Sequence, residues 1–533
     1  MDCTTTQLSY AQTGAFSKIV LDYVSQSPQL RPFFEFEPTL EGIKKAVEAR
    51  SKVAVDRAAL VQHLKDQYRG IELNIAVGRN IDSLLSPATF TVTTAHQNNI
   101  FTGPLYFLYK IIHAIRLAER LNMEMPSHHF VPVYYMGSED ADLEELNHIH
   151  LAGTKLVWQP NQRGAVGRMK VDKELLKLID AIEGQLAVLP HGAEVVSILR
   201  ESYQAGDSIQ GATLKIVNKL FASYGLVVLV PDSPTLKKSM QTIFEDDLLN
   251  QSASSIVSQA SNRLAEHYKV QAHPREINLF YLHNDLRERI EQRDGGYVVV
   301  NTNLAFSREE ILRELSDHPE RFSPNVILRG LYQETILPNV IFIGGGGELA
   351  YWLELNDLFR HYKTPYPVLM LRNSFLVMDQ RWKQKADKLG FSIAEIFLPE
   401  ADLLNLLVRR DSDKKVELNG TLSATEEMYE TIKKQAGSID ATLTKHVDSL
   451  KTVTLHKLRE LEKKMLRAEK RKFSDQQRQI HALKENLFPA SGLQERIDNM
   501  LSYYATWGGG FIRALYTSSP SIENAFVVLS VSE

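Results

Sequence analysis

The sequence of 533 residues predicts an α/β protein with a parallel sheet, a helical insertion and a long helical coiled coil. Two strand-like runs, residues 90–95 and 130–136, flank a helical pattern, and a helix between two strands is typical of a parallel βαβ unit. A continuous apolar run at residues 224–232, and a second apolar run at residues 368–376 with a polar interruption, are typical of strands buried in a parallel sheet. Residues 391–487 are rich in Glu, Lys and Leu, with apolar side chains mostly three or four positions apart, which indicates a coiled coil.

The composition is that of a soluble, folded protein of about two to four domains. Hydrophobic residues make up 44% and charged residues 24%, and the net charge of -4 gives no whole-molecule attraction to nucleic acid or anionic lipid. The single cysteine, Cys3, excludes an internal disulfide and a CxxC metal site. No charged and apolar leader opens the chain and no run of about 18 apolar residues occurs, so we expect a cytoplasmic protein without a membrane span.

The helix between the first two strands is expected to begin near Thr102. Thr102 is a suitable N-cap and Pro104 suits the first turn. Apolar residues then recur along one helical face, at Leu105, Leu108, Ile112 and Ile115. Residues 1–90 are expected to be largely helical and to pack on the sheet, and residues 173–220 to form helices of the insertion.

Two polar loops follow these two strands and predict a ligand site. The residues are His96, Gln97, Asn98 and Asn99 in the first loop, and Ser138, Glu139, Asp140, Asp142, Glu144 and Glu145 in the second. Parallel strands end at the same edge of a sheet, where α/β proteins bind ligands, so the loops are expected to meet. Their side chains are expected to be exposed, so that alanine substitutions there leave the fold intact. The alternative is that the acidic loop is a solvated helix start, which favours carboxylates.

A third candidate loop, residues 161–170, carries two glycines beside Arg163, Arg168 and Lys170. Such a loop suits a phosphate or carboxylate ligand, but it lacks the Lys-Ser/Thr pattern of a P-loop. A plain hairpin turn explains it about as well. Residues 155–158, just ahead of it, are expected to form a short strand.

Further candidates lie between residues 271 and 376. His273 and Arg275 precede an apolar, strand-like segment, although a hydrogen-bonded structural histidine explains His273 at least as well. Gly344 to Gly347 stand between an apolar run and a helix expected from Glu348, where glycines let an anion approach free backbone amides. The run is not GxGxxG, so it does not specify a dinucleotide. Polar residues Arg372-Asn373-Ser374 interrupt the apolar run of residues 368–376.

The coiled-coil interval is expected to form two helices separated at residues 437–440, where glycine suits a helix end. The second helix, residues 441–487, would be roughly 70 Å long, too long for the first to cover. Its uncovered apolar seam predicts a homodimer and comprises Leu458, Leu461, Met465, Ile480, Leu483 and Leu487. The alternative is that a terminal helix, residues 492–512 ending at Gly508–Gly510, covers the seam within one chain.

Nine segments, spread in order over nearly the whole chain, resemble the bacillithiol biosynthesis cysteine-adding enzyme family. They are FTGPLYFLYKII, SEDADLEELNH, GAVGRM, HPREINLFYL, LYQETILPN, IGGGGELAYWLEL, MLRNSF, MLRAEKRKF and LFPASGLQER. The sequence differs from the family pattern in its first loop, which is His96-Gln97-Asn98-Asn99 in place of a glutamine-rich version, and at Gly330, where a proline is expected.

The resemblance implies a Rossmann-like core related to class I nucleotidylyl transferases, with connecting-peptide insertions and a dimerising coiled coil. On that basis residues 1–400 are expected to form the core, with helical insertions at about 155–222 and 235–270. Residues 401–487 are expected to form the coiled coil. Residues 488–533 are expected to form a helical segment that packs back on the core.

The implied activity is a ligase that joins L-cysteine to the amine of glucosaminyl malate, the last step of bacillithiol biosynthesis. A carboxylate is a poor acylating agent, so ATP or ADP is the expected cofactor, with Mg²⁺ as a candidate companion and no defined metal site. His96 and Asn99 are then expected near a phosphate. Glu139 and Asp140 would hold the cysteine ammonium or deprotonate the incoming amine.

The resemblance also implies a set of substrate contacts. Lys155 and Arg168 would meet the malyl carboxylates. Gly345, Gly346 and Gly347 would contact the nucleotide, and Arg372 the nucleotide or the substrate. The remaining candidate substrate contacts are His273, Arg275 and Asn373.

Two other functions stay open at this stage. Residues 457–484 hold ten Lys or Arg against four acidic residues, and an RNA-binding, synthetase-like protein would use such an arm, although charge at solvent-facing coiled-coil positions is the more frequent cause. A dimeric scaffold without activity would use the same coil and leave the polar loops unused. We expect small-molecule substrates, a homodimer, and neither a nucleic-acid nor a membrane partner.

Overall fold

The computed structural model describes residues 1–413 and 417–532, which form two compact units. The first unit contains Met1–Ala11, Ala15–Val377 and the segment from Gly492 onward, and the second contains Gln12–Gly14 and Met378–Ser491. The boundary thus falls at Val377 and not near residue 400. Among the described residues, no helix is long and apolar enough to cross a membrane.

The first unit is built on a five-stranded sheet in the order β13-β12-β2-β3-β6. These strands are Val368–Leu371, Asn339–Gly344, Thr89–Gln97, His129–Gly137 and Val227–Leu229. Every neighbouring pair is parallel, which confirms the predicted βαβ unit and the strands expected at residues 224–232 and 340–343. From β2 the chain adds β3 and then β6 on one side, and later adds β12 and β13 on the other. The strand order therefore reverses between β2 and β12, which is where α/β sheets of this kind bind ligands.

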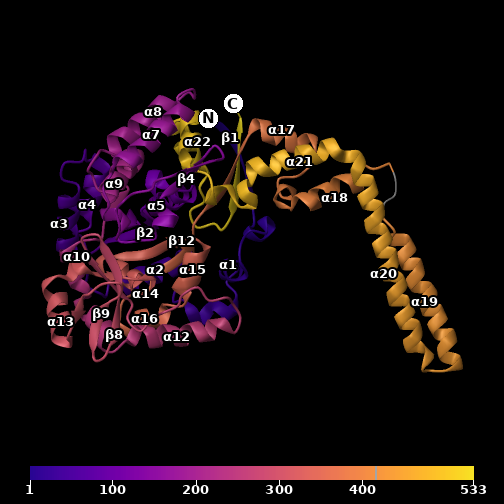
Figure 1. Cartoon of the computed structure of the whole chain (residues 1–533), viewed down its shortest axis with the longest axis horizontal. Helices are drawn as coiled ribbons and strands as arrows, with labels where there is room; N and C mark the ends of the chain where they lie inside the picture. Colours follow the sequence, from indigo (N-terminus) through magenta and orange to yellow (C-terminus); the bar gives the residue numbers. More distant parts are fainter. Residues whose placement is uncertain (414–416, 533) are drawn as a thin grey trace. The chain divides into compact units, whose positions relative to one another are not determined.

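The crossover helix α5, Tyr106–Glu124, joins β2 to β3 and packs on the sheet (Figure 1). It starts later than expected, and Thr102 is not its N-cap. Phe101, Thr102 and Gly103 have φ angles of 48°, 71° and 63°, so the chain makes a left-handed turn before the helix. Asn499 stabilises this turn because its side-chain amide donates to the carbonyl oxygens of Phe101 (2.9 Å) and Gly103 (2.6 Å).

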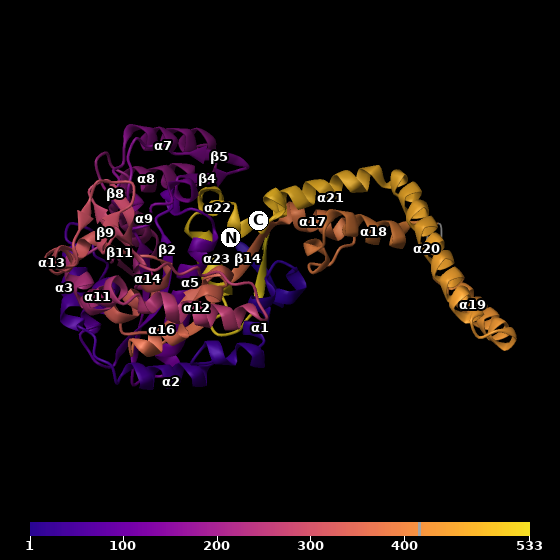
Figure 2. The same ribbon diagram turned by 60° about the horizontal axis from the view of Figure 1, so that its bottom comes forward.

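Helices precede the sheet and fill the insertions, as predicted. The first group is α1 Lys18–Val24, α2 Leu40–Arg50, α3 Arg57–Gln67 and α4 Ile75–Ser83. The apolar sides of α2 and α5 share one core cluster with β2, β12 and β13. The insertion helices are α7 Lys173–Leu186, α8 Gly192–Ser202, α9 Ile209–Phe221, α10 Pro234–Lys237, α11 Gln241–Leu249 and α12 Ser252–Ala265. Helices α7, α8 and α9 lie together in both views (Figures 1 and 2).

Two further sheets and a hairpin were not predicted. An antiparallel sheet has the order β10-β9-β8-β7-β11, whose strands are Ala305–Phe306, Gly296–Val299, Leu286–Arg293, Leu279–His283 and Phe322–Pro324. A three-stranded sheet has the order β1-β15-β14, whose strands are Asp2–Leu8, Phe526–Ser532 and Ser374–Asp379. The hairpin pairs β4, His148–Leu151, with β5, Thr154–Val157, which matches the short strand expected at residues 155–158.

The apolar run of residues 368–376 is two strands and not one. β13 ends at Leu371, and β14 starts at Ser374 in a different sheet, so Arg372 and Asn373 form the link between the two sheets. Helices complete this unit at α6 Leu143–Leu146, α13 Arg308–Asp317, α14 Val326–Ile336, α15 Gly346–Leu353, α16 Asn356–His361, α22 Met500–Trp507 and α23 Gly509–Ser518. Gly508, with φ 57°, ends α22 as predicted, but a second helix and strand β15 follow it.

The second unit is helical, with α17 Gln380–Lys388, α18 Glu400–Asp411, α19 Asn419–Ile439, α20 Leu443–Lys470 and α21 Ser474–Leu487. Helices α19 and α20 lie side by side as an antiparallel hairpin (Figures 1 and 2). Ion pairs of Lys433 with Asp448 (2.7 Å) and of Lys451 with Glu430 (2.6 Å) join them. The break expected at residues 437–440 is confirmed, since Asp440 caps α19.

The single long helix expected over residues 441–487 is wrong, because a short 3-10 turn at Arg471–Phe473 separates α20 from α21. Ile480, Leu483 and Leu487 are fully buried within one chain, in a helix that packs against α17 and α18. This part of the seam therefore needs no second copy to cover it. On α20, Leu461 remains 48% exposed.

Candidate functional site

A cavity of about 560 Å³ opens where the strand order of the parallel sheet reverses. Residues at the carboxyl ends of four parallel strands line it: His96 and Gln97 after β2, Ser138 to Asp140 after β3, Gly345 to Gly347 after β12, and Arg372 after β13. Other lining residues come from α5, from α14 and from the antiparallel sheet. The position is the one that strand topology favours for a ligand.

The two polar loops meet at this cavity, as predicted from their position after neighbouring parallel strands. The side-chain amide of Gln97 donates to Asp140 (2.8 Å) and to Glu145 (3.2 Å), and the amide of Asn99 donates to the carbonyl oxygen of Glu145 (3.2 Å). Asp142 caps the four-residue helix α6 through the N–H group of Glu145, so the expected helix start is also present. The two explanations of the acidic loop are therefore compatible.

The glycine loop of residues 161–170 supports the second polar loop. The N–H groups of Val166 and Gly167 donate to the carbonyl oxygens of Asp140 (2.8 Å) and Ser138 (3.0 Å). A Cβ atom on Gly167 would lie only 2.3 Å from the Ser138 oxygen, so this close backbone approach requires glycine. The loop is thus neither a simple hairpin turn nor a cradle for phosphate, because its amides are bonded to the neighbouring loop.

His96 is buried in the cavity wall, with 7% of its surface exposed. Its ring packs against Phe107, with centroids 5.2 Å apart, and against the edge of Tyr106 at 5.3 Å. Within the described part of the chain its Nε2 atom has no hydrogen-bond partner. Burial, together with the nearby charges of Lys110 and Arg329, holds the pKa of His96 well below its ordinary value. The ring is therefore neutral at physiological pH, with one nitrogen left for a ligand.

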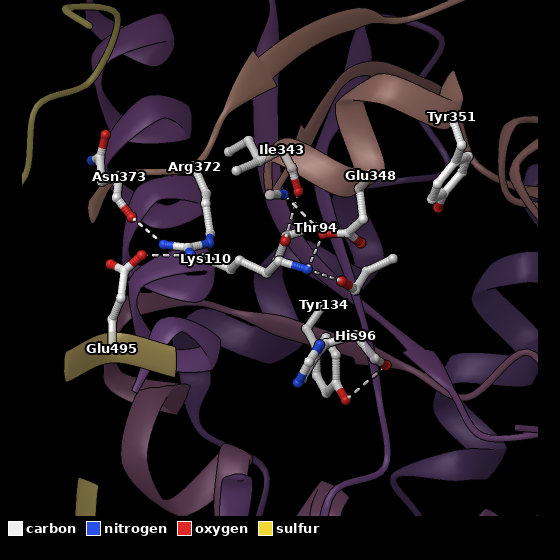
Figure 3. Close-up of polar contacts among 12 residues, drawn as sticks. Thr94, His96, Lys110, Tyr134, Ile343, Glu348, Tyr351, Arg372, Asn373 and Glu495 are labelled. Atoms are coloured by element: carbon white, nitrogen blue, oxygen red, sulfur yellow. Dashed lines mark hydrogen bonds and ion pairs between the residues drawn. The ribbon is translucent and has the colours of Figure 1, made fainter. Parts of the chain in front are cut away.

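Lys110 is a buried cation in the first turns of α5 (Figure 3). Its ammonium group donates to the carbonyl oxygen of Ala95 (2.9 Å) and forms an ion pair with Glu348. Glu348 also accepts the N–H group of Gly345 (2.8 Å) at the start of α15. Burial lowers the pKa of Lys110, although the charge of Glu348 opposes that shift. These contacts tie the end of β2 to the glycine run after β12.

Arg372 is also buried and forms an ion pair with Glu495 at 2.7 Å (Figure 3). Burial alone would lower the pKa of Arg372, but the carboxylate of Glu495 raises it above the ordinary value. The guanidinium carbon lies 5.0 Å from the centre of the Tyr106 ring, which lines the same cavity. Arg372 is thus a fixed positive charge in the cavity wall.

Arg329 adds a third cation from α14. It donates to the Tyr351 hydroxyl (3.1 Å). Burial opposes its charge, but Tyr351, Asp140 and Glu348 outweigh that effect and raise the pKa of Arg329. Burial likewise opposes ionisation of Asp140, but its hydrogen bond from Gln97 and the nearby arginines lower its pKa. Both groups are therefore charged at neutral pH.

Glu139 lies in a buried network that the sequence did not reveal. It is 9% exposed and forms an ion pair with Lys237, whose side chain is fully buried. Burial raises the pKa of Glu139, and the charge of Lys237 opposes this shift. Next to this pair, Arg168 donates two hydrogen bonds of 2.6 Å to Asp232. Arg168 is thus held by a carboxylate of the protein itself.

Several predicted site residues do not line the cavity. Lys155 is exposed on the β4–β5 hairpin, and His273 and Arg275 are exposed ahead of β7. Asn373 is buried, but its amide donates to Ser519 (2.6 Å) and to the carbonyl oxygen of Pro520 (2.6 Å), so it has a structural role. The predicted residues that do line the cavity are His96, Gln97, Ser138, Glu139, Asp140, Glu145, Gly345, Gly346, Gly347 and Arg372. Asn99 does not line it.

The sequence did not single out several polar residues of the cavity, among them Tyr106, Lys110, Arg287, Glu348 and Arg496. Tyr106 and Lys110 are four residues apart on α5, and such a pair on one face of the crossover helix was a usable signal. Glu348, three residues after Gly345, was a second signal, because a glutamate at that position can accept the N–H group of the residue that precedes the helix. Within residues 1–413 and 417–532, no group of His, Cys, Asp and Glu side chains is arranged to hold a metal ion.

The fold and the cavity define the class of protein: a Rossmann-like α/β protein with a cavity lined by charged residues at the switch point of its sheet. Two family models match the chain. "Bacillithiol biosynthesis BshC, N-terminal Rossmann-like domain" matches residues 1–373, and "Bacillithiol biosynthesis BshC, C-terminal coiled-coil domain" matches residues 375–531. The chain belongs to the BshC family of bacillithiol biosynthesis. The predicted fold class and the family resemblance are therefore confirmed.

Relatives match over nearly the full length. A protein of Flavobacterium johnsoniae is 37% identical, with 98% of this chain and 99% of the relative covered. Proteins of Flavobacterium psychrophilum and Christiangramia forsetii are each 38% identical, with coverage of 95% and 96%, and of 98% and 98%, respectively. All three carry the name "Putative cysteine ligase BshC".

Proposed function

We propose that the protein is a cysteine ligase of bacillithiol biosynthesis, which joins the carboxyl group of L-cysteine to the amine of glucosaminyl malate. Membership of the BshC family and the name of its relatives support the reaction class. The observation that carries the proposal is the charge composition of the switch-point cavity. Cations and carboxylates line one cavity. The substrates of this reaction need both, because they carry an ammonium group, several carboxylates and, in ATP, phosphate groups.

Amide formation needs an activated carboxyl group, and we propose that ATP supplies it. A carboxylate oxygen of cysteine attacks a phosphorus atom of ATP. Attack at the α-phosphorus forms an adenylate and releases pyrophosphate, whereas attack at the γ-phosphorus forms an acyl phosphate and releases ADP. The neutral amine of the acceptor then attacks the carbonyl carbon and releases AMP or inorganic phosphate. The fixed cations Lys110, Arg329 and Arg372, beside the Cβ-free run Gly345 to Gly347, suit the phosphate groups.

The remaining lining residues suit the other two substrates. Asp140 and Glu139 would hold the ammonium group of cysteine. The Nε2 atom of His96, which has no partner among the described residues, would either donate a hydrogen bond to a phosphate oxygen or accept a proton from the amine. Arg287 and Arg496 would meet the malyl carboxylates, in place of Lys155, which lies outside the cavity, and Arg168, which is bound to Asp232.

The test is a reconstituted reaction of purified protein, L-cysteine, glucosaminyl malate, ATP and Mg²⁺, read by mass spectrometry. The expected product is the cysteinyl amide, formed only when ATP is present. Release of AMP and pyrophosphate would identify an adenylate, and release of ADP and phosphate an acyl phosphate. No amide under any of these conditions would contradict the ligase, and an RNA-specific gel shift without amide would favour the RNA-binding alternative.

His96→Gln is the sharpest single substitution for this reaction. It keeps a polar, neutral side chain of similar size but removes the titratable ring, so the rate should fall by about 100-fold or more. His148→Gln is the matched control, because His148 lies on the β4–β5 hairpin and does not line the cavity. A wild-type rate in His96→Gln would exclude His96 from the chemistry.

A further inference from the structure

The short segment Gln494 to Asn499 follows the second unit in the chain and is anchored in the first unit at both of its ends. Gln494 exchanges two hydrogen bonds with the backbone of Val377, at 2.9 and 3.0 Å, where the chain leaves the first unit. Asn499 holds the left-handed turn ahead of α5, as described above. Between these anchors lie Glu495, which pairs with Arg372, and Arg496, which lines the cavity.

Glu495 is fully buried, does not line the cavity and accepts hydrogen bonds from Arg372 in the link between β13 and β14 and from the first two residues of β14. Its Oε1 atom accepts hydrogen bonds from Arg372 (2.7 Å) and Ser374 (3.2 Å), and its Oε2 atom accepts the N–H group of Phe375 (3.3 Å). A carboxylate bound at three points has one defined orientation. Glu495 therefore dictates where the Arg372 guanidinium lies.

These contacts leave one side of the guanidinium for a ligand. Its Nη1 atom donates to Asn373 (3.0 Å) and Ser374 (3.2 Å), and its Nη2 atom donates to Glu495. Within the described part of the chain the Nε–H group has no acceptor. A Cβ atom on Gly345 would lie 3.5 Å from Nε, so this nitrogen lies next to the glycine run that lines the cavity.

We propose that Glu495 is a positioning residue, which holds Arg372 so that its Nε–H group and the N–H groups of Gly346 and Gly347 at the start of α15 form one receptor for a phosphate group. The identity of that group as part of a nucleotide rests on the proposed ligase function. The segment from Gln494 to Asn499 is then part of the site, although it lies more than a hundred residues beyond β13 in sequence. Glu495 acts through Arg372 and does not touch the ligand.

The test measures binding of inorganic pyrophosphate to the full-length protein by isothermal titration calorimetry. Wild type binds it, and Glu495→Gln and Arg372→Ala each weaken binding by about tenfold, the equivalent of one charged hydrogen bond. The double variant binds no more weakly than Arg372→Ala alone, because both substitutions remove the same interaction. The proposal is overturned if wild type does not bind pyrophosphate, if Glu495→Gln binds as wild type does, or if the two effects multiply.

Glu495→Asp is the second variant, because Glu495→Gln leaves a buried guanidinium unpaired and can fail to fold. Aspartate keeps the negative charge but withdraws the carboxylate from Arg372, so binding weakens while the chain stays folded. Wild-type affinity in folded Glu495→Asp contradicts a positioning role. Glu314→Gln is the matched control, since it breaks another arginine–carboxylate pair, Glu314 with Arg321 (2.6 Å), outside the cavity lining. Equal weakening in this control also overturns the proposal.

Ligase kinetics separate this inference from the proposed function. In the amide-forming assay Glu495→Gln raises the KM for ATP by about tenfold and leaves the KM for cysteine unchanged. An unchanged KM for ATP contradicts the inference. If wild type forms no amide, the ligase proposal fails, while the pyrophosphate titrations still decide the role of Glu495.

Discussion

His96 and Glu139 are buried, at 7% and 9% exposure, whereas polar loop residues were expected to be exposed. Substitutions there act on folding as well as on chemistry. Loss of the Glu139 carboxylate, for example, leaves the Lys237 ammonium buried without its partner, at a cost of about 3 to 5 kcal/mol. Substitutions that preserve shape therefore test these positions better than alanine does.

Glu334 is a single residue that should make the free energy of unfolding depend on pH. It is fully buried beneath the sheet and accepts hydrogen bonds from Gln333 and Asn339, both at 2.8 Å. Burial raises its pKa from 4.5 to about 7. Between these two values the folded protein binds more protons than the unfolded chain. The free energy of unfolding should therefore fall as pH rises from about 4.5 to 7, by on the order of 3 kcal/mol.

Glu334→Gln mimics the protonated acid and should remove this dependence. The variant is expected to match wild type near pH 4.5 and to be more stable at pH 8, as measured by urea unfolding at both values. The informative quantity is the difference in the free energy of unfolding between the variant and wild type, because all other groups titrate equally in both proteins. A difference that stays constant with pH would contradict a raised pKa at Glu334.

At the scale of elements, the cavity depends on backbone segments that touch without intervening side chains. Gly167 is the clearest case, because its loop packs directly on the loop after β3. Gly167→Ala should lower the free energy of unfolding by about 1 to 3 kcal/mol, since the new methyl group displaces Ser138. The ligase rate should fall as well, because Ser138 precedes Glu139 and Asp140.

Gly184→Ala is the control for Gly167→Ala. Gly184 lies in α7, where a Cβ atom meets no other atom within 4 Å, so alanine should stabilise the helix by up to about 1 kcal/mol. Urea unfolding and the ligase assay measure both variants. Equal stability of Gly167→Ala and wild type would show that the two loops move apart without cost.

At the scale of the whole molecule, the α19–α20 hairpin leaves apolar side chains in water, with Leu450, Val453 and Leu461 exposed by 45%, 55% and 48%. Each costs about 1.5 to 3 kcal/mol relative to burial. We still propose a homodimer through this hairpin, now on the basis of α20 alone, because the residues of α21 are buried within one chain. A second copy is the usual partner of such a surface.

The double substitution Leu461→Glu with Met465→Glu tests the dimer. Charges in a dimer seam should halve the mass measured by light scattering and leave the melting temperature nearly unchanged. Ile480→Glu is the control, since Ile480 is fully buried and a charge there should unfold the helices around it. A dimer mass in the double variant would refute an interface at this part of α20.

The sequence by itself determined the elements that local patterns encode. Apolar runs specified the parallel strands, helical periodicity specified α5 and the α19–α20 hairpin, and the two strand ends placed His96 and Glu139 at one edge of the sheet. These features follow from side-chain period and from parallel pairing, which act over short stretches of chain.

Only the tertiary structure decided which charged groups meet. Arg372 pairs with Glu495, 123 positions later in the sequence, and is held in the wall of the cavity. Arg168 pairs with Asp232, 64 positions later, so it is not available to a substrate. Lys155 begins a predicted strand and Lys110 lies in the predicted helix after Thr102, yet Lys155 is exposed to solvent and Lys110 is buried against Glu348. A buried charge must find a partner, and that partner depends on which elements the fold packs together, a choice that no local pattern encodes.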